Sequence, residues 1–483
     1  MVVNRHDAAL RRLELVEEDE RDPGADRTRP GRPSDAPEGP RPPGVSPGPD
    51  HDGERPRRGR HVAVAVVAVA AVAAVFVASS VWQGMAGRDA LLGSVGGVST
   101  LATPPAPRWE ASGTDAWAVG DALVVADGTA LAGLSPADGS RRWSTDLGAT
   151  PRCGGEDDAV TDSLVCLTGD EDAPTAWVVD AGGAVVSRVP LGDGPGRAVP
   201  APQGGVLRWQ RAGGTVTVTV QDASDASVRW SATVRPDDQR RPGLCRPQVS
   251  GSASGRVENG LLVVRGCRVS AVFTPDGARV DDAGEPVTVQ VLPTAEGSFL
   301  RTTSASATGD VELTQLVRSD GTVERIVPGR PLVPLASDGT ADPTRLLSVP
   351  SGVQAVDPSG SERWTLSGNV TQVLAVAGGT GVLDKGYVVA GVDLASGRET
   401  WSWAREDLGT TDAVTGAFTD GRVAAVVLSS LDGTGTARVV ALDLDDGEVL
   451  WDERVAGDGT GLRALGGTLV LVDPAEGRVV ALG

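Results

Sequence analysis

The stretch Ala441-Leu-Asp443-Leu-Asp-Asp-Gly447-Glu-Val-Leu-Trp451 indicates the fold of this chain, because variants of it recur along most of the sequence. Each copy has an apolar strand, a turn that ends in glycine, and a second strand that carries a tryptophan. Earlier copies stand at Val392–Trp401, Val356–Trp364 and Leu134–Trp143. A unit that recurs along a chain in this way predicts an array of small, similar modules.

The composition agrees with an array of short strands. The 483 residues include 64 glycines and 33 prolines, with valine-rich runs between them, which is typical of strands joined by tight turns. The formal net charge is −20, and residues 1–60, with 13 acidic and 12 basic side chains, contribute only −1 of it. The rest of the chain is therefore acidic and would repel a phosphate backbone, so we expect no nucleic-acid partner.

One segment has the length and composition of a membrane span. Val62–Trp82 holds 21 residues without a charge, and as a helix it would extend about 32 Å. Four arginines precede it, at positions 55, 57, 58 and 60. The positive-inside rule then predicts a single-pass protein of the cytoplasmic membrane, with a cytoplasmic N-terminus and residues 83–483 outside. The alternative is a signal peptide cleaved near Ala78-Ser-Ser80, but the preceding sixty residues and the long apolar run favour an uncleaved anchor.

These features divide the chain into four parts. We expect a cytoplasmic, mostly disordered tail at residues 1–60, because its proline, glycine and charged residues cannot bury enough apolar surface. A transmembrane helix follows at 61–82. Residues 83–108, which end in Thr103-Pro-Pro-Ala-Pro107, are expected to form a stalk. Residues 109–483 hold the repeats.

The repeat unit has the size of a propeller blade. Two-strand turns are anchored at eight positions, namely Ser135, Asp180, Asp222, Thr274, Arg318, Asp357, Asp393 and Asp443, and they are 36 to 52 residues apart. Further apolar runs precede most turns, which makes about four strands per unit. A tryptophan follows the anchor by eight residues in four units and by seven in another. A large ring at a fixed offset can pack in the seam between neighbouring units.

This pattern resembles the pyrroloquinoline-quinone-type (PQQ-like) β-propeller repeat, Ala-x-Asp-x-x-x-Gly-x-x-x-Trp. The resemblance covers residues 109–483. It implies that the tryptophan docks between blades and that the glycine completes the turn. The residues that carry it are Gly139, Trp143, Asp357, Gly360, Trp364, Asp393, Gly397, Trp401, Asp443, Gly447 and Trp451. No tryptophan follows the anchors at 180, 274 and 318, and we expect looser seams there.

The two ends of the repeat region predict a closed ring. The C-terminal residues fit two strands of a blade, and the segment around Trp109 resembles the tryptophan strand that this blade lacks. An N-terminal strand that completes the last blade would leave no open edge. We therefore expect an all-β propeller of eight blades, with seven to nine possible and one weak unit forming a hairpin insertion.

Four cysteines follow the predicted span. In an oxidising compartment they predict two structural disulfides, and we favour Cys153–Cys166 and Cys245–Cys267 because each pair falls within one repeat unit. A zinc site is the alternative. The sequence has no Cys-x-x-Cys motif, however, and all three histidines lie at or before residue 61.

The same shortage of histidine restricts catalysis. A Ser-His-Asp or Cys-His system cannot be assembled after residue 61, which leaves carboxylates as the main acid–base groups. We expect no catalytic, cofactor-binding or metal-binding residues and no cofactor. The leading hypothesis is a non-enzymatic scaffold that binds an extracytoplasmic protein or an envelope polymer, as the resemblance implies for relatives that lost the quinone.

Two enzymatic hypotheses remain open. The resemblance would imply, for a quinoprotein dehydrogenase, a quinone, a calcium ion, an aspartate base and often an adjacent Cys-Cys pair, and no such pair occurs in this sequence. A carboxylate-based glycosidase would need two acidic side chains about 5 to 10 Å apart, which the sequence cannot select.

Overall fold

The computed structural model describes residues 87–483, except 155–159, 193–195, 213–214, 236–252, 267–268, 282–286, 295–296, 305–311, 340–343, 406–411, 431–435 and 458. All described residues belong to one compact unit. The predicted tail (1–60) and transmembrane helix (61–82) lie outside the described residues. In the part that is described, no helix is long and apolar enough to cross a membrane.

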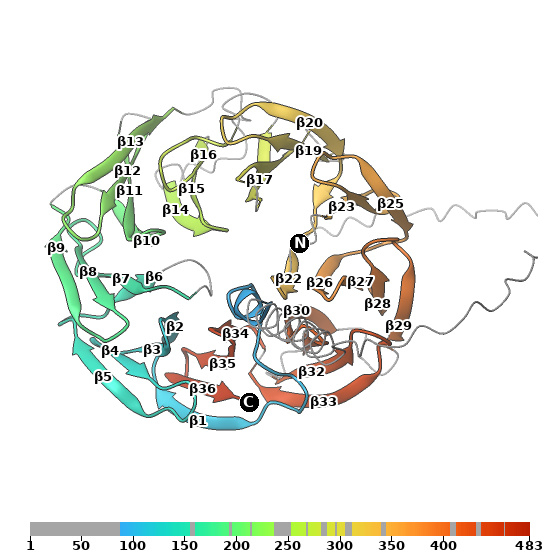
Figure 1. Ribbon diagram of the computed structural model, residues 1–483. Coiled ribbons are helices and arrows are strands. Elements are labelled where there is room, and N and C mark those ends of the chain that lie inside the picture. The colour runs from blue at the N-terminus through green and yellow to red at the C-terminus, as the bar shows by residue number, and fades with distance from the viewer. Residues whose placement is uncertain are drawn as a thin grey trace, which may run out of the picture. The chain divides into compact units, whose positions relative to one another are not determined.

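The described residues form nine sheets arranged radially around one centre (Figure 1). We number these blades in chain order. Blade 1 holds β2 (Asp115–Val119), β3 (Ala122–Asp127), β4 (Ala130–Leu134) and β5 (Arg141–Asp146). Blade 2 holds β6 (Arg152–Gly154), β7 (Ser163–Thr168), β8 (Thr175–Asp180) and β9 (Val185–Pro190). Blade 3 holds β10 (Arg197–Ala201), β11 (Gly205–Ala212), β12 (Thr215–Asp222) and β13 (Val228–Val234).

The middle blades are less regular. Blade 4 has three strands among the described residues, β14 (Ala253–Glu258), β15 (Leu261–Gly266) and β16 (Val269–Phe273). Blade 5 holds β17 (Val287–Pro293), β18 (Phe299–Ser304), β19 (Glu312–Val317) and β20 (Val323–Pro328). Blade 6 holds β21 (Arg330–Pro331), β23 (Arg345–Val349), β24 (Gly352–Val356) and β25 (Glu362–Ser367).

The last three blades complete the ring. Blade 7 has five strands, β22 (Pro334–Ser337), β26 (Gln372–Ala377), β27 (Thr380–Asp384), β28 (Val388–Asp393) and β29 (Glu399–Ala404). Blade 8 holds β30 (Asp412–Thr419), β31 (Val423–Ser430), β32 (Thr436–Asp443) and β33 (Val449–Ala456). Blade 9 combines β34 (Leu462–Leu465), β35 (Thr468–Asp473) and β36 (Arg478–Leu482) with the N-terminal strand β1 (Pro107–Ser112).

The burial of the strands explains their sequences. Strands in the middle of a blade, such as β3 and β35, are buried over four or more consecutive residues because another blade covers each face. Outer strands such as β5 and β9 alternate between exposed and half-buried residues, since only one of their faces meets a neighbour. Continuous valine and leucine runs therefore mark the middle strands, and alternating runs mark the outer ones.

The preferred count of eight blades was wrong, because the described residues form nine sheets. The unit anchored at Thr274, one of the weak repeats, makes a sheet of its own and not a hairpin insertion within another blade. Each of the eight anchored turns lies in a separate sheet. The ninth sheet is the one that the two ends of the chain share.

Ring closure occurs as the sequence predicts. Strand β1 pairs antiparallel with β36, with Trp109 opposite Ala481 and Ser112 opposite Arg478. The two strands lie side by side at the junction of the first and last blades (Figure 1). Blade 9 thus takes strands from both ends of the repeat region and leaves neither β1 nor β36 as a separate open end.

The segment expected to form a stalk is folded against the ring between residues 87 and 106. A short helix at 87–92 is followed by a strap, residues 93–101, that hydrogen-bonds to three blades. Ser337 N–H donates to the Val95 carbonyl at 2.8 Å, Val98 N–H to Thr419 at 2.9 Å, and Ser99 N–H to Gly467 at 2.8 Å. This differs from an extended spacer, because Val98 and Leu101 are apolar side chains that the ring buries.

The outer edge of blade 4 is blocked by side chains. Beside β16, the outermost described strand of this blade, the Asp281 carboxylate accepts the Val272 N–H at 2.9 Å, and the Val280 N–H donates to the Val272 carbonyl at 2.9 Å. Arg279 holds Asp281 through two hydrogen bonds, of 2.8 and 2.9 Å. Asp281 is 6% exposed, so this pair satisfies backbone groups of β16 that would otherwise offer a template for strand pairing.

We expect Asp281→Ala to loosen this edge. The change leaves the buried Val272 N–H without an acceptor, which costs about 1–3 kcal/mol. Hydrogen exchange at the Val272 amide should accelerate, and the thermal midpoint should fall. Asp225→Ala, which removes an exposed turn acceptor of the Ser227 N–H, is the matched control and should change both measurements little. Equal effects of the two variants would contradict the edge role.

Candidate binding site

The repeat turns have a common geometry. Each predicted glycine adopts a positive φ, +70° at Gly139, +76° at Gly360, +71° at Gly397 and +75° at Gly447, and its N–H donates back to the anchor carbonyl. Glycine adopts this conformation without steric cost. All these turns join the last two strands of a blade. They therefore lie on the same face of the ring as the turns between first and second strands. We call this face of the ring the turn face.

The aspartates of the repeat stabilise these turns. Asp357 accepts hydrogen bonds from the Ser359 hydroxyl at 2.6 Å and the Ser361 N–H at 2.9 Å, and these bonds lower the pKa of Asp357. Hydrogen bonds from the Ser396 hydroxyl and N–H lower the pKa of Asp393 in the same way. Asp443 accepts the Asp445 N–H at 2.8 Å. Asp357 and Asp393 therefore order their turns as ions, the form that accepts such bonds best.

The tryptophans dock on the turn of the next blade. The Trp143 indole N–H donates to the carbonyl of Ala181 at 2.9 Å, and Trp364 and Trp401 donate to Leu394 and Leu444, each at 2.8 Å. In every case the acceptor is the residue directly after the anchor. The ring covers the turn glycine, so that a Cβ added at Gly183, Gly397 or Gly447 would lie within 2.6 Å of it. Each of these seams therefore combines a hydrogen bond from the indole N–H with a close contact between the tryptophan ring and the turn glycine.

Two further tryptophans also dock on the turn of a neighbouring blade, and a third docks on the N-terminal segment. Trp109 and Trp230 donate to Pro136 and Pro275 at 3.0 and 2.8 Å, and their rings cover Gly139 and Gly277. Trp451 instead donates to the Leu101 carbonyl at 2.7 Å. The N-terminal segment therefore takes the place of a blade turn at the seam between blades 8 and 9.

Where the tryptophan is missing, the seam is different. In β9 the position holds Ser187, whose hydroxyl donates to the Ala223 carbonyl at 3.3 Å, and the turn of blade 3 has Ala226 in place of glycine. In β20 it holds Arg325, whose guanidinium donates to the Ser359 carbonyl at 2.9 Å while its stem covers Gly360. No described residue lies over Gly321 in blade 5. The seams that lack a tryptophan therefore differ from one another: a serine fills one, an arginine fills another, and no described side chain covers the glycine of the third.

A matched pair of glycines can test the contribution of the ring contact. Gly183 and Gly321 have φ of +82° and +84° and make the same backbone bond, but only Gly183 lies under a tryptophan. Gly321→Ala should cost about 1–2 kcal/mol for its left-handed conformation. Gly183→Ala should cost a further ~1–3 kcal/mol, because the added methyl overpacks against Trp143. Thermal unfolding measures both, and equal losses would contradict the seam model.

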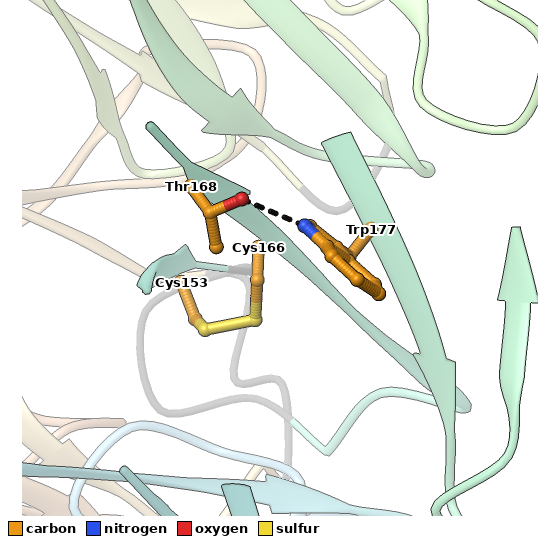
Figure 2. The surroundings of a disulfide bond; sticks show 4 residues. All are labelled: Cys153, Cys166, Thr168 and Trp177. Carbon is orange, nitrogen blue, oxygen red and sulfur yellow. Dashed lines mark hydrogen bonds between the residues drawn. A yellow bond between two sulfur atoms is a disulfide. The ribbon is translucent and has the colours of Figure 1, made fainter. Parts of the chain in front are cut away.

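The structure contains the Cys153–Cys166 disulfide that the sequence favours. The two cysteines are directly opposite each other in β6 and β7, with Cα atoms 4.0 Å apart. Figure 2 shows the bond beside Trp177, whose indole N–H donates to the Thr168 hydroxyl at 2.8 Å. The bond ties the three-residue inner strand of blade 2 to its neighbour. Cys245 and Cys267 lie outside the described residues.

An open cavity of about 810 Å³ lies on the turn face over blades 4 to 7. Its walls come from the first turn of blade 4, the ends of β17 and β18, the connections on either side of β22, and residues 93–95 of the strap. Most of the wall is apolar. Its apolar lining residues include Leu261, Phe299, Leu300, Leu332, Val333 and Val376.

The position of the cavity follows from the packing beneath it. The smallest described apolar clusters are those between blades 4 and 5 and between blades 5 and 6, where no tryptophan fills the seam. Polar side chains occupy the middle strands of blade 5, among them Arg301, which donates to the Gln315 side chain at 2.7 Å. Less apolar volume is available to close the face over these blades.

An unusual strand shapes one wall. The chain leaves blade 6 after β21, forms β22 as the innermost strand of blade 7, and returns to blade 6 at β23. Strand β22 runs parallel to β26, with Ala336 opposite Ala375. The connection before it exposes Val333, which is 42% accessible, and the strap exposes Val95, which is 56% accessible, both at the cavity. Exposed apolar side chains beside an apolar hollow are typical of binding sites.

The lining has little capacity for acid–base chemistry. Among the described residues of the wall, Arg345 is the one ionisable side chain, and the other polar groups are hydroxyls and the amide of Asn259. The Arg345 guanidinium donates to the Pro358 carbonyl at 3.1 Å. General acid–base catalysis requires a group that gains or loses a proton near neutral pH, and arginine does not.

The chemistry of a quinone enzyme does not fit these residues. A quinone-bound calcium ion needs several oxygen donors at one place. In the described part of the chain, no three His, Cys, Asp or Glu side chains are grouped for a metal ion. The described cavity wall offers no carboxylate to such an ion.

Comparison with protein families gives one match. A family described as outer membrane protein assembly factor BamB matches residues 335–483, which cover most of blades 6 and 7, all of blade 8 and the three C-terminal strands of blade 9. The match identifies residues 335–483 as PQQ-like repeats, and the nine sheets make the described residues a β-propeller. The residues matched include the best copies of the repeat, at Asp393 and Asp443. A comparison with curated proteins found no match.

Solved structures of low identity resemble this propeller. BamB from Moraxella catarrhalis is 14% identical, with 78% of this chain and 99% of that chain covered and a TM-score of 0.42. Apo AztD from Citrobacter koseri is 12% identical, with 71% and 96% covered and a TM-score of 0.33. A eukaryotic initiation factor is 12% identical, with 74% and 91% covered and a TM-score of 0.34. At these scores the likenesses carry no argument about this propeller.

Proposed function

We propose that this propeller is a non-enzymatic binding protein whose binding site is the cavity on the turn face. The observation that carries the proposal is the wall of that cavity. It is large and mostly apolar, it has exposed valines at its opening, and its described residues include no proton-transferring group. Such a surface offers burial of apolar groups to a partner and offers no chemistry to a substrate.

The fold supports a scaffold role. The blades are joined by tryptophan–glycine seams and by the shared blade 9, so the turns are held on a rigid ring. Loops on a rigid scaffold are common binding surfaces. The matched family is described as an assembly factor, which agrees with a partner that is a protein.

A crosslinking experiment tests the binding face. A photoreactive amino acid replaces Val333, which is 42% exposed at the cavity, or Tyr387, which is 79% exposed on the opposite face between β27 and β28. We expect a protein partner to be captured in intact cells from the Val333 position, and Tyr387 serves as the control. The same products from both positions, or none from either, would reject the turn face as the binding face.

We further propose that residues 61–82 anchor the propeller on the outer side of the cytoplasmic membrane. The support is the charge-free Val62–Trp82 segment and the four arginines that precede it. Burial of uncharged side chains in the bilayer would hold the chain, and the arginines would remain on the cytoplasmic side. A disulfide in blade 2 agrees with an oxidising compartment.

The orientation has a direct test. With a tag at each end of the full chain, protease added to spheroplasts should remove the C-terminal tag and leave the N-terminal tag protected. Both tags should remain on one membrane-bound chain before digestion. A propeller released without its N-terminal tag would indicate the cleaved signal peptide instead, and two protected tags would place the propeller inside.

A further inference from the structure

We infer that the turn-face cavity holds the hydrocarbon chain of a long-chain fatty acid. This inference rests on the proposed binding function: the protein partner contacts the exposed valines Val95 and Val333, and the cavity beside them takes a lipid chain. The argument depends on the size and apolar composition of the cavity, on the hydrogen-bonding capacity of its wall, and on the charge of the described wall residues.

The size and composition of the cavity suit a flexible apolar chain. Its volume of about 810 Å³ lies within the range of sites that bury small ligands. Leu261, Phe299, Leu332 and Val376 contribute apolar surface from four different blades. A hydrocarbon chain can follow an irregular wall of this kind, and each methylene group that leaves water favours binding.

The wall is poorly suited to an extended peptide. A peptide that enters a groove needs partners for its own backbone N–H and carbonyl groups. Four wall residues are prolines, at positions 275, 293, 331 and 334, and proline has no backbone N–H to donate. A hydrocarbon chain makes no such demand. The prolines that disfavour a peptide therefore favour an acyl chain.

The charge of the wall indicates the head group. The chain has 64 acidic and 44 basic residues, yet the described wall holds one arginine and no carboxylate. Arg345 stands at the start of β23, and its hydrogen bond to the Pro358 carbonyl helps to fix the guanidinium. A planar guanidinium pairs well with a carboxylate. We therefore place the fatty acid carboxylate on the Arg345 side of the cavity.

The test uses a palmitic acid that carries a photoreactive diazirine on its chain, added to the full-length protein in lipid nanodiscs. After irradiation, peptide mapping should place the label on cavity residues from β18, β26 or the connection at Leu332-Val333. Excess unlabelled palmitate should reduce the labelling at least tenfold. Label confined to residues 61–82, or spread over the outer strands, would overturn the inference.

Two matched pairs of variants sharpen the result. Val333→Trp fills the opening of the cavity, and Val186→Trp places the same ring on β9, at a valine that is 63% exposed. Labelling should fall about tenfold in the first variant and stay unchanged in the second.

Arg345→Gln should remove the preference for palmitate over hexadecanol as competitor, and Arg454→Gln, on β33, should keep it. Unchanged labelling in Val333→Trp would overturn the site, and an unchanged preference in Arg345→Gln would overturn the placement of the head group.

Failure of the fatty acid inference can be distinguished from failure of the proposed binding function. If a protein is still captured from the Val333 position while palmitate does not label the cavity, the fatty acid inference fails and the binding function stands. If both fail, the cavity is not the binding site.

Discussion

The architecture depends on one repeated contact, in which a tryptophan of one blade covers the turn glycine of the next and donates to the neighbouring carbonyl. The contact requires a positive φ at the glycine, no Cβ beneath the ring, and an acceptor at the residue after the anchor. One turn meets all three requirements, because the turn that contains the glycine also presents the acceptor carbonyl of the residue after the anchor. Where Ser187 stands in place of the ring, the next turn tolerates Ala226.

The irregular blades can be understood as departures from this contact. Between blades 4 and 6 no tryptophan fills the seams, polar groups such as Arg301 and Gln315 are buried in blade 5, and the turn face stays open. Arginine side chains supply other contacts in these blades. Arg325 replaces a tryptophan with its guanidinium and stem, and the Arg279–Asp281 pair covers the edge of blade 4. The cavity thus forms where apolar packing is weakest, on a ring that other contacts hold closed.

The N-terminal residues that follow the predicted span belong to the ring in two ways. The strap at 93–101 hydrogen-bonds to blades 7, 8 and 9, and its Leu101 carbonyl accepts the Trp451 indole. Strand β1 then completes blade 9. The same segment lines the cavity with Val95. Closure of the ring and the shape of the proposed binding site are therefore coupled through one stretch of chain.

The repeat, the turn residues and the Cys153–Cys166 pair could be predicted from the sequence because they depend on short spacings along the chain. The closing strand at Trp109 could also be predicted, because the tryptophan strand that it supplies is the one that the last blade lacks. The number of blades, the carbonyl that each seam tryptophan reaches and the strap across three blades become visible only in the folded structure. The same is true of the cavity, whose wall joins residues from 93 to 394. Contacts between residues so far apart depend on how whole blades pack, and no local pattern of residue types encodes that packing.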